Sequence, residues 1–128
     1  MAQEFLFRGK TIEELKVLDI REFSKYLTSR DKRYVLRQSS KIQKFVSRCK
    51  KKEKAGKKIR THDRTMIIVP EMIGLIINIH NGKDFVMIRI IPEMLGRKLG
   101  EFAMTRKKVE HSAPGIGATR SSASLSVK

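Results

Sequence analysis

The chain has 128 residues and a formal net charge of +16, with 29 Lys and Arg against 13 Asp and Glu. A chain of this length forms one modest domain with a small core, and it contains neither the run of about 18 apolar residues that a membrane helix needs nor a secretory signal, so we expect a cytoplasmic protein with no membrane partner. Cys49 is the only cysteine, which excludes an internal disulfide and, without further ligands at zinc spacing, a zinc site; we expect it to be a buried small hydrophobe.

Residues 1–29 are predicted to form a helical extension with balanced charge. Thr11 with Glu14, and Asp19 with Glu22, have the spacing of capping boxes, so two short helices are expected. Their apolar faces would consist of Ile12, Leu15 and Leu18 in the first helix, and Phe23, Tyr26 and Leu27 in the second. The carboxylates of this segment alternate with basic residues, as in solvated ion pairs, so we expect no metal site here.

Residues 30–60 are predicted to form a long basic helix followed by a flexible loop. The segment carries most of the excess positive charge. An apolar stripe at helical spacing consists of Val35, Leu36, Ser39, Ile42, Phe45, Val46 and Cys49. A second stripe consists of Arg33, Arg37, Lys41, Lys44 and Arg48, and further cations follow at Lys50, Lys51, Lys52, Lys54, Lys57, Lys58 and Arg60. The helical pattern is lost around Gly56, where a loop is expected.

Such a helix can pack on a core with one face and present cations to an acidic partner with the other. A solvated face that only keeps the protein soluble is one alternative, and a membrane surface or an acidic protein is another. We favour phosphate backbones, because so much like charge in one segment costs self-repulsion that an anionic partner removes.

Residues 61–105 are predicted to form the sheet core of the same domain. Asn81-Gly82 lies between two apolar runs, which is a strong signal for a hairpin with a two-residue turn of positive φ. The expected strands are residues 74–80 and 84–91. The motif Pro-Glu-Met-apolar-Gly occurs at residues 70–74 and again at 92–96. Two copies are too few for a repeat architecture, so we interpret them as reused turn chemistry, with Met72 and Met94 in the core.

A catalytic function has few candidate residues. A metal-dependent nuclease could in principle use His62, Asp63, His80, His111, Glu71, Glu93 and Glu101. However, His80 adjoins the turn, and Glu71 and Glu93 follow prolines where a carboxylate can accept backbone N–H groups. The glycines of a nucleotide-binding loop are also missing. We therefore expect a protein that is not an enzyme and that has no metal or cofactor.

Residues 106–128 are predicted to be a flexible tail, because they contain few large apolar side chains. The tail contains the segment Pro114-Gly115-Ile116-Gly117-Ala118-Thr119. Together with the hairpin, both Pro-Glu-Met motifs and the segment from Arg97 to Phe102, this order of motifs resembles the nineteen family of universal small-subunit ribosomal proteins. The tail segment resembles the archaeal and eukaryotic branch, and the absence of a long basic leader favours an archaeal source.

The resemblance implies that the protein binds the 3′ head domain of small-subunit ribosomal RNA, with residues matching Lys83, Arg97, Lys98 and Arg106 near RNA. Arg64, Lys107 and Lys108 complete the predicted RNA-binding set. The resemblance also implies a neighbouring protein of the thirteen family in the subunit head. It further implies a tail that reaches toward the decoding region and its A-site transfer RNA. Removal of residues 107–128 should then leave assembly largely intact while altering translation.

The fold predicted for the whole chain is α+β, with a small, mainly antiparallel sheet, flanking N-terminal helices, the basic helix and the tail. With two Tyr and six Phe, many of them in core patterns, we expect recognition of RNA shape and backbone rather than an aromatic platform that stacks successive bases. The alternative function is a free, sequence-independent nucleic-acid binder, such as an RNA chaperone or a chromatin protein.

Overall fold

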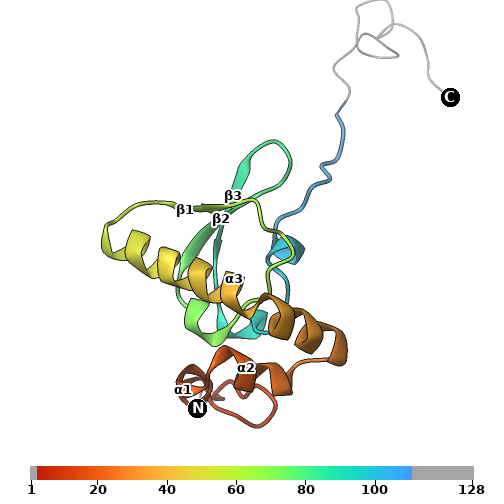
Figure 1. Ribbon diagram of the computed structural model, residues 1–128. Helices are drawn as coiled ribbons and strands as arrows, with labels where there is room; N and C mark the ends of the chain where they lie inside the picture. The colour runs from red at the N-terminus through yellow and green to blue at the C-terminus, as the bar shows by residue number, and fades with distance from the viewer. Residues whose placement is uncertain (1–2, 111–128) are drawn as a thin grey trace, which may run out of the picture.

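The fold is α+β, as the sequence predicts. Figure 1 shows a computed structural model of the protein, and the structure describes residues 3–110. Helices α1 (Ile12–Val17) and α2 (Ile20–Phe23) precede the long helix α3 (Ser29–Lys54), which is followed by strands β1 (Ile59–Thr61), β2 (Ile76–His80) and β3 (Phe85–Arg89). Short 3₁₀ helices cover Ser24–Tyr26, Pro70–Met72, Pro92–Met94 and Leu99–Phe102. The predicted tail beyond residue 110, with His111 and the motif at 114–119, lies outside the described residues.

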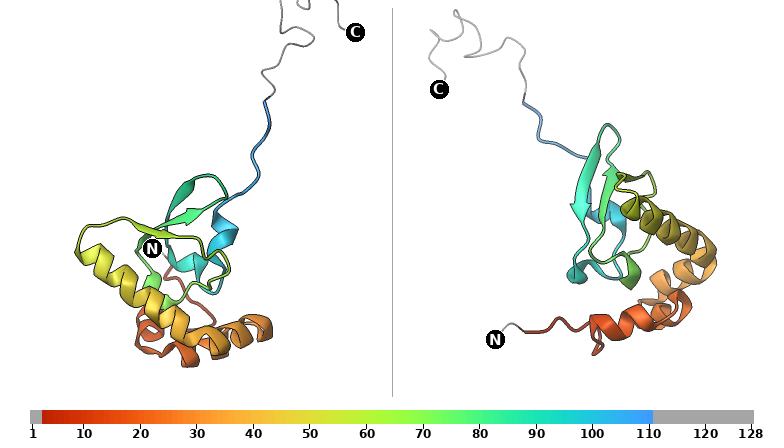
Figure 2. Two further views of the ribbon diagram at one scale, coloured as in Figure 1. Left: turned by 45° about the horizontal axis from the view of Figure 1, so that its top comes forward. Right: turned by 90° about the vertical axis from the view of Figure 1, so that its left-hand side faces the viewer.

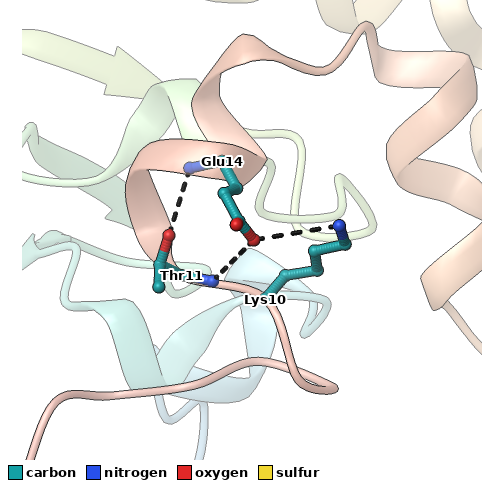
Figure 3. Close-up of polar contacts among 3 residues, drawn as sticks. All are labelled: Lys10, Thr11 and Glu14. Carbon is teal, nitrogen blue, oxygen red and sulfur yellow. Dashed lines mark hydrogen bonds and ion pairs between the residues drawn. The ribbon is translucent and has the colours of Figure 1, made fainter.

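The first helix begins at the predicted capping box (Figure 3). The Glu14 N–H donates to Thr11 Oγ1 at 3.4 Å, and the Thr11 N–H donates to Glu14 Oε2 at 3.3 Å. Lys10 Nζ lies 3.8 Å from the same carboxylate oxygen. Because these contacts satisfy N–H groups that the first turn of a helix leaves free, they explain why a helix of only six residues begins here.

The second helix has a similar start and buries its apolar face. Asp19 is the N-cap of α2, and its N–H donates to Glu22 Oε2 at 3.4 Å. Phe23 is fully buried, as predicted, and Leu15 of α1 is buried beside the same core. Helix α2 and the 3₁₀ turn Ser24–Tyr26 pack against α3, whereas α1 contacts the Pro70–Met72 turn.

Helix α3 buries the predicted apolar stripe with one exception. Six of the seven predicted residues are buried, whereas Leu36 is 44% exposed. Successive residues of a helix are about 100° apart, so Leu36 lies off the line from Val35 to Cys49, on the side away from Phe45. The prediction for Leu36 was therefore wrong. A second feature that the pattern missed is non-helical backbone at Gln38, where two helices join at a kink just before Ser39 and Ser40.

The lysines that follow the apolar stripe are still helical, and the helix ends shortly before Gly56, where a loop was expected. Helix α3 continues to Lys54, and Gly56, with φ of +67°, follows its end. A glycine in the left-handed region just after a helix is a common stop signal. Residues 59–61 then form β1, so this strand begins two residues before the predicted start of the sheet core at residue 61. The lysines up to Lys54 are consequently held at helical spacing.

The sheet has the order β1-β2-β3, with β1 parallel to β2 and β2 antiparallel to β3. The predicted hairpin is confirmed, although its strands are shorter than expected. In the turn, the Asn81 N–H donates to the Asp84 carbonyl at 2.9 Å, and Asn81 Oδ1 accepts the N–H groups of Lys83 and Asp84. Gly82 has φ of +104°, whereas Asn81 keeps a negative φ. The turn is thus centred one residue later than predicted, and Asn81 acts through its side chain.

The repeated motif forms the same local structure twice. Each copy is a 3₁₀ turn followed by a glycine of positive φ, Gly74 or Gly96. The Gly74 N–H donates to the Ile90 carbonyl and the Gly96 N–H to the Ile68 carbonyl. Met72 is fully buried as predicted, and Met94 is partly buried against the core. Neither turn has a side-chain cap, so the predicted cap roles of the motif glutamates were wrong.

Helix α3 covers one face of the sheet (Figure 2). Ile77, Ile79 and Ile88 of the sheet join Ile42, Phe45 and Val46 of α3 in one buried cluster. The side chains of strands alternate between faces, so the opposite face of the sheet carries a different set of residues. The positive face of α3 and this second sheet face are the two surfaces available for a partner.

Candidate nucleic-acid interface

The predicted basic stripe lies on the outer face of α3. Arg33, Arg37, Lys41, Lys44 and Arg48 are all exposed. A shallow surface groove runs along this face, lined by Ser40, Gln43, Lys44, Ser47, Arg48 and Lys51. Because α3 is anchored through its apolar stripe, its cations are held in fixed positions, at helical spacing on either side of the kink at Gln38.

Within residues 3–110, most of these cations have no carboxylate partner. Of the five stripe residues, only Lys41 forms an ion pair among residues 3–110, with Asp63 Oδ1 at 3.1 Å. Lys50 is separate from the stripe, because its ammonium pairs with Glu71 at the Pro70–Met72 turn. The helix therefore keeps an uncompensated positive surface, which is the electrostatic footprint of a phosphate-binding protein.

Further predicted cations lie outside the stripe, in the last turns of α3, after its end, in β1 and in the hairpin turn. Lys51 lies in the last turns of α3 and is exposed, and Lys52 is partly exposed. Lys57 and Lys58 follow the helix end, and Arg60 projects from β1; all three are exposed. Lys83 is exposed in the hairpin turn.

Arg64 has a different position from the other predicted residues. Its guanidinium donates to the carbonyls of His80 at 2.7 Å and Gly100 at 2.8 Å, and also to that of Ala103. These bonds tie the end of β2 to the last 3₁₀ helix. Charge-assisted bonds to three carbonyls use three of the five N–H donors of this side chain, so its contribution to the site is to hold the hairpin and the segment after residue 103 together.

The remaining predicted cations lie near the end of the described chain. Arg97 is exposed and pairs with Glu101 at 3.6 Å, and Lys98 forms a bridge with Ile67 through its backbone. Arg106, Lys107 and Lys108 are exposed on an extended segment that leaves the domain beyond the last 3₁₀ helix (Figure 1). The predicted set is thus distributed over α3, the hairpin and this segment rather than gathered at one point.

The structure also contains a ring cluster that was not predicted from the sequence. The rings of His62 and His80 lie 4.3 Å apart between centroids and are tilted by 34°. Phe85 meets both histidines edge-on, and the Arg60 guanidinium lies 5.2 Å from the centroid of the Phe85 ring. The count of Tyr and Phe overlooked the histidines, and the parallel pairing of β1 that brings His62 here has no short-range sequence signal.

The nuclease residues do not assemble into a metal site among residues 3–110, where no three His, Cys, Asp or Glu side chains gather in a metal-binding group. His80 has the predicted turn role, since its Nδ1 accepts the Gly82 N–H at 3.0 Å. No helix within the described range is long and apolar enough to cross a membrane.

Cys49 is buried in the apolar stripe of α3, as predicted, and is only 1% exposed. Burial raises the pKa of its thiol to about 11, because a thiolate would lose its hydration, although the positive charges of Arg48 and Lys52 oppose this shift. A thiol with a raised pKa is a poor nucleophile. Cys49 therefore contributes packing and not chemistry.

An α+β domain with one rigid, exposed and uncompensated basic helix face belongs to the class of proteins that bind nucleic acids through their phosphates. Comparison with protein families identifies which member of this class is present. The family model described as ribosomal protein S19 matches residues 31–111, which include most of α3, the whole sheet and the last 3₁₀ helix. The chain belongs to the ribosomal protein S19 family, and it is an RNA-binding protein of the small ribosomal subunit.

Proposed function

We propose that this protein binds and shapes the 3′ head domain of small-subunit ribosomal RNA by neutralising phosphates along the outer face of α3. The role is structural rather than catalytic, and it is exerted in cytoplasmic ribosomes. The single observation that supports the proposal most directly is the row of exposed cations on α3, of which only Lys41 has a carboxylate partner within residues 3–110.

The rigidity of this surface favours a folded RNA as its target. Helix α3 is fixed by six buried residues, so the spacing of its cations cannot follow an arbitrary backbone path. A-form RNA is recognised largely through its shape and its phosphates. The cations of the loop and the hairpin, Lys57, Lys58 and Lys83, would extend this contact around the domain.

Two further partners belong to the proposal. We infer that a protein of the thirteen family is the neighbour in the subunit head. We also infer that the chain beyond Ala103 extends toward the decoding region and the A-site transfer RNA. The anchoring of the Ala103 carbonyl by Arg64 supports a defined direction for the start of that segment.

The first experiment is crosslinking of the protein to RNA in living cells, followed by sequencing of the attached fragments. Crosslinks concentrated in the 3′ head domain are expected. Crosslinks scattered over messenger RNAs would instead favour a free, sequence-independent binder.

The second experiment tests which surface binds. The triple variant Arg37→Gln, Lys44→Gln, Arg48→Gln removes three stripe charges, and the matched control Lys16→Gln, Arg21→Gln, Lys25→Gln removes three exposed charges from the N-terminal helices. In titrations with a head-domain transcript at several salt concentrations, each lost phosphate contact lowers the slope of log K against log salt by about one. We expect a decrease of about two to three for the stripe variant and almost none for the control. Equal decreases would show that only net charge matters.

A further inference from the structure

The sheet face opposite α3 carries an ordered set of exposed residues. Arg60, Asn78 and Met87 lie side by side in the register of the three strands, and His80 pairs with Phe85. Residues directly opposite each other in a sheet point to the same face, and Ile77 with Ile88 points into the core. Met87 is 71% exposed, Ile76 50% and Phe85 36%. This face is therefore uncovered in the described part of the chain.

At the hairpin end of this face, planar side chains from all three strands converge. His62 directly follows β1, His80 ends β2 and Phe85 begins β3. The two imidazole rings lie 4.3 Å apart, and Phe85 supports them edge-on at 5.3 and 5.0 Å. The Arg60 guanidinium lies over the Phe85 ring. The outer members of the cluster, His62 and Arg60, are exposed.

The cluster is held in place by backbone contacts. The ring of His80 accepts the Gly82 N–H through Nδ1, and its carbonyl accepts a bond from Arg64. Arg64 in turn holds the carbonyls of Gly100 and Ala103. These contacts hold the His80 ring and the end of β2 in place before any ligand arrives, which lowers the entropy cost of binding.

The charges around the cluster favour a nucleic acid over an apolar protein segment. Lys58, Arg60, Lys83 and Arg89 are exposed on this side of the sheet or in its turn. The nearby carboxylates are fewer: Asp84 in the turn, Asp63, which is paired with Lys41, and Glu53 at the far edge. Bases stack on aromatic rings and on guanidinium planes, while phosphates are attracted by the surrounding cations.

We infer that the exposed planes of His62 and Arg60, supported by Phe85 and His80, form a stacking site for an unpaired RNA base. This inference rests on the proposed function, because it assumes an RNA partner, but it assigns a second contact of a different kind. The face of α3 binds phosphates of a folded RNA, whereas the cluster binds the π-face of a base that has left its helix.

The test compares two single-stranded probes of equal length and charge: a twelve-nucleotide uridine RNA and the same chain with abasic ribose at every position. Stacking of one base contributes a preference of roughly 5- to 150-fold for the probe with bases. We expect the full-length protein to show such a preference. We also expect the variants His62→Ala and Arg60→Lys to lose most of it.

Matched variants separate stacking from charge. Arg60→Lys keeps the positive charge and removes the planar group, and Arg89→Lys makes the same change on the same sheet face outside the cluster. His62→Phe keeps a planar ring at this position, in contrast to His62→Ala. Arg89→Lys and His62→Phe should retain the preference. Thermal melts of each variant check that the fold is intact, as expected for exposed side chains.

The outcomes distinguish the inference from the proposed function. Equal, salt-dependent affinity of the unchanged protein for both probes would overturn stacking, leave phosphate binding in place and point to a protein partner for this face. Loss of preference in Arg89→Lys as strong as in Arg60→Lys would also overturn it. If the protein binds neither of the two probes and does not bind a head-domain transcript, both proposals are overturned.

Discussion

At the scale of single residues, position in the fold decides what a side chain does. Arg64 is as basic as Arg60, yet its guanidinium holds three carbonyls, whereas that of Arg60 lies on the surface over Phe85. Cys49 is a similar case, because it lies among charged residues in the sequence but is buried in the core. Its thiol therefore contributes to the stability of the fold and is a poor nucleophile.

This position predicts a pH dependence of stability. The pKa of the Cys49 thiol is raised from 9.0 to about 11 in the folded protein, so the folded state holds the proton more tightly than the unfolded state. The resulting stability is complete below about pH 9 and is lost as the pH rises through 11, by roughly 3 kcal/mol at most. The free energy of unfolding in urea should be measured for the protein and for Cys49→Ala across this pH range, and it should decline more for the unchanged protein. If the two free energies changed in parallel with pH, the predicted contribution of Cys49 would be contradicted.

At the scale of elements, the last 3₁₀ helix lies so close to the segment after β1 that there is no room for a side chain at Gly100. A Cβ added at Gly100 would lie 2.8 Å from the Arg64 carbonyl oxygen, and the Gly100 N–H donates to that same oxygen. Gly74 is a glycine for another reason, because its φ is +89° while a Cβ there would meet no atom within 4 Å. Gly100 is thus needed because there is no space for a side chain, whereas Gly74 is needed because of its backbone conformation.

Four variants test this distinction. Gly74→Ala should cost about 1–2 kcal/mol, because alanine disfavours the left-handed region, and Gly74→Asn should cost less, because asparagine tolerates it. Gly100→Ala should cost about 1–3 kcal/mol through overpacking, and Gly100→Asn should cost at least as much. Denaturant midpoints provide the measurement. Rescue by asparagine at Gly100 would show that steric contact with Arg64 is not the cause.

At the scale of the whole molecule, the distribution of charge matters more than its total. Residues 3–29 and the sheet are nearly balanced, whereas α3 and its following loop carry most of the surplus and residues 106–128 carry the rest. A domain of this kind repels itself along one surface when alone, and an RNA partner relieves that repulsion.

The predicted consequence is steep salt dependence of RNA binding. If about six to ten phosphates are neutralised, the affinity for a head-domain transcript should fall by roughly 10³- to 10⁵-fold between 50 and 200 mM salt. Filter binding or fluorescence anisotropy across this range measures the slope. A flat profile would contradict phosphate neutralisation as the main source of affinity.

The sequence by itself determined the features that depend on neighbouring residues. The capping box at Thr11, the apolar and basic stripes of α3 and the hairpin around Gly82 all follow from local hydrogen bonding and from the periods of helix and strand. Family membership could also be predicted, because it rests on the order of short motifs.

Only the tertiary structure decided the features that join distant segments. The parallel pairing of β1 with β2 and the engagement of Arg64 have no local signal. The same is true of the cluster of His62, His80 and Phe85. The physical reason is that these contacts depend on how helices and strands pack and on which loops close. A local sequence pattern does not specify which distant segment a strand or side chain will contact, and only packing decides this.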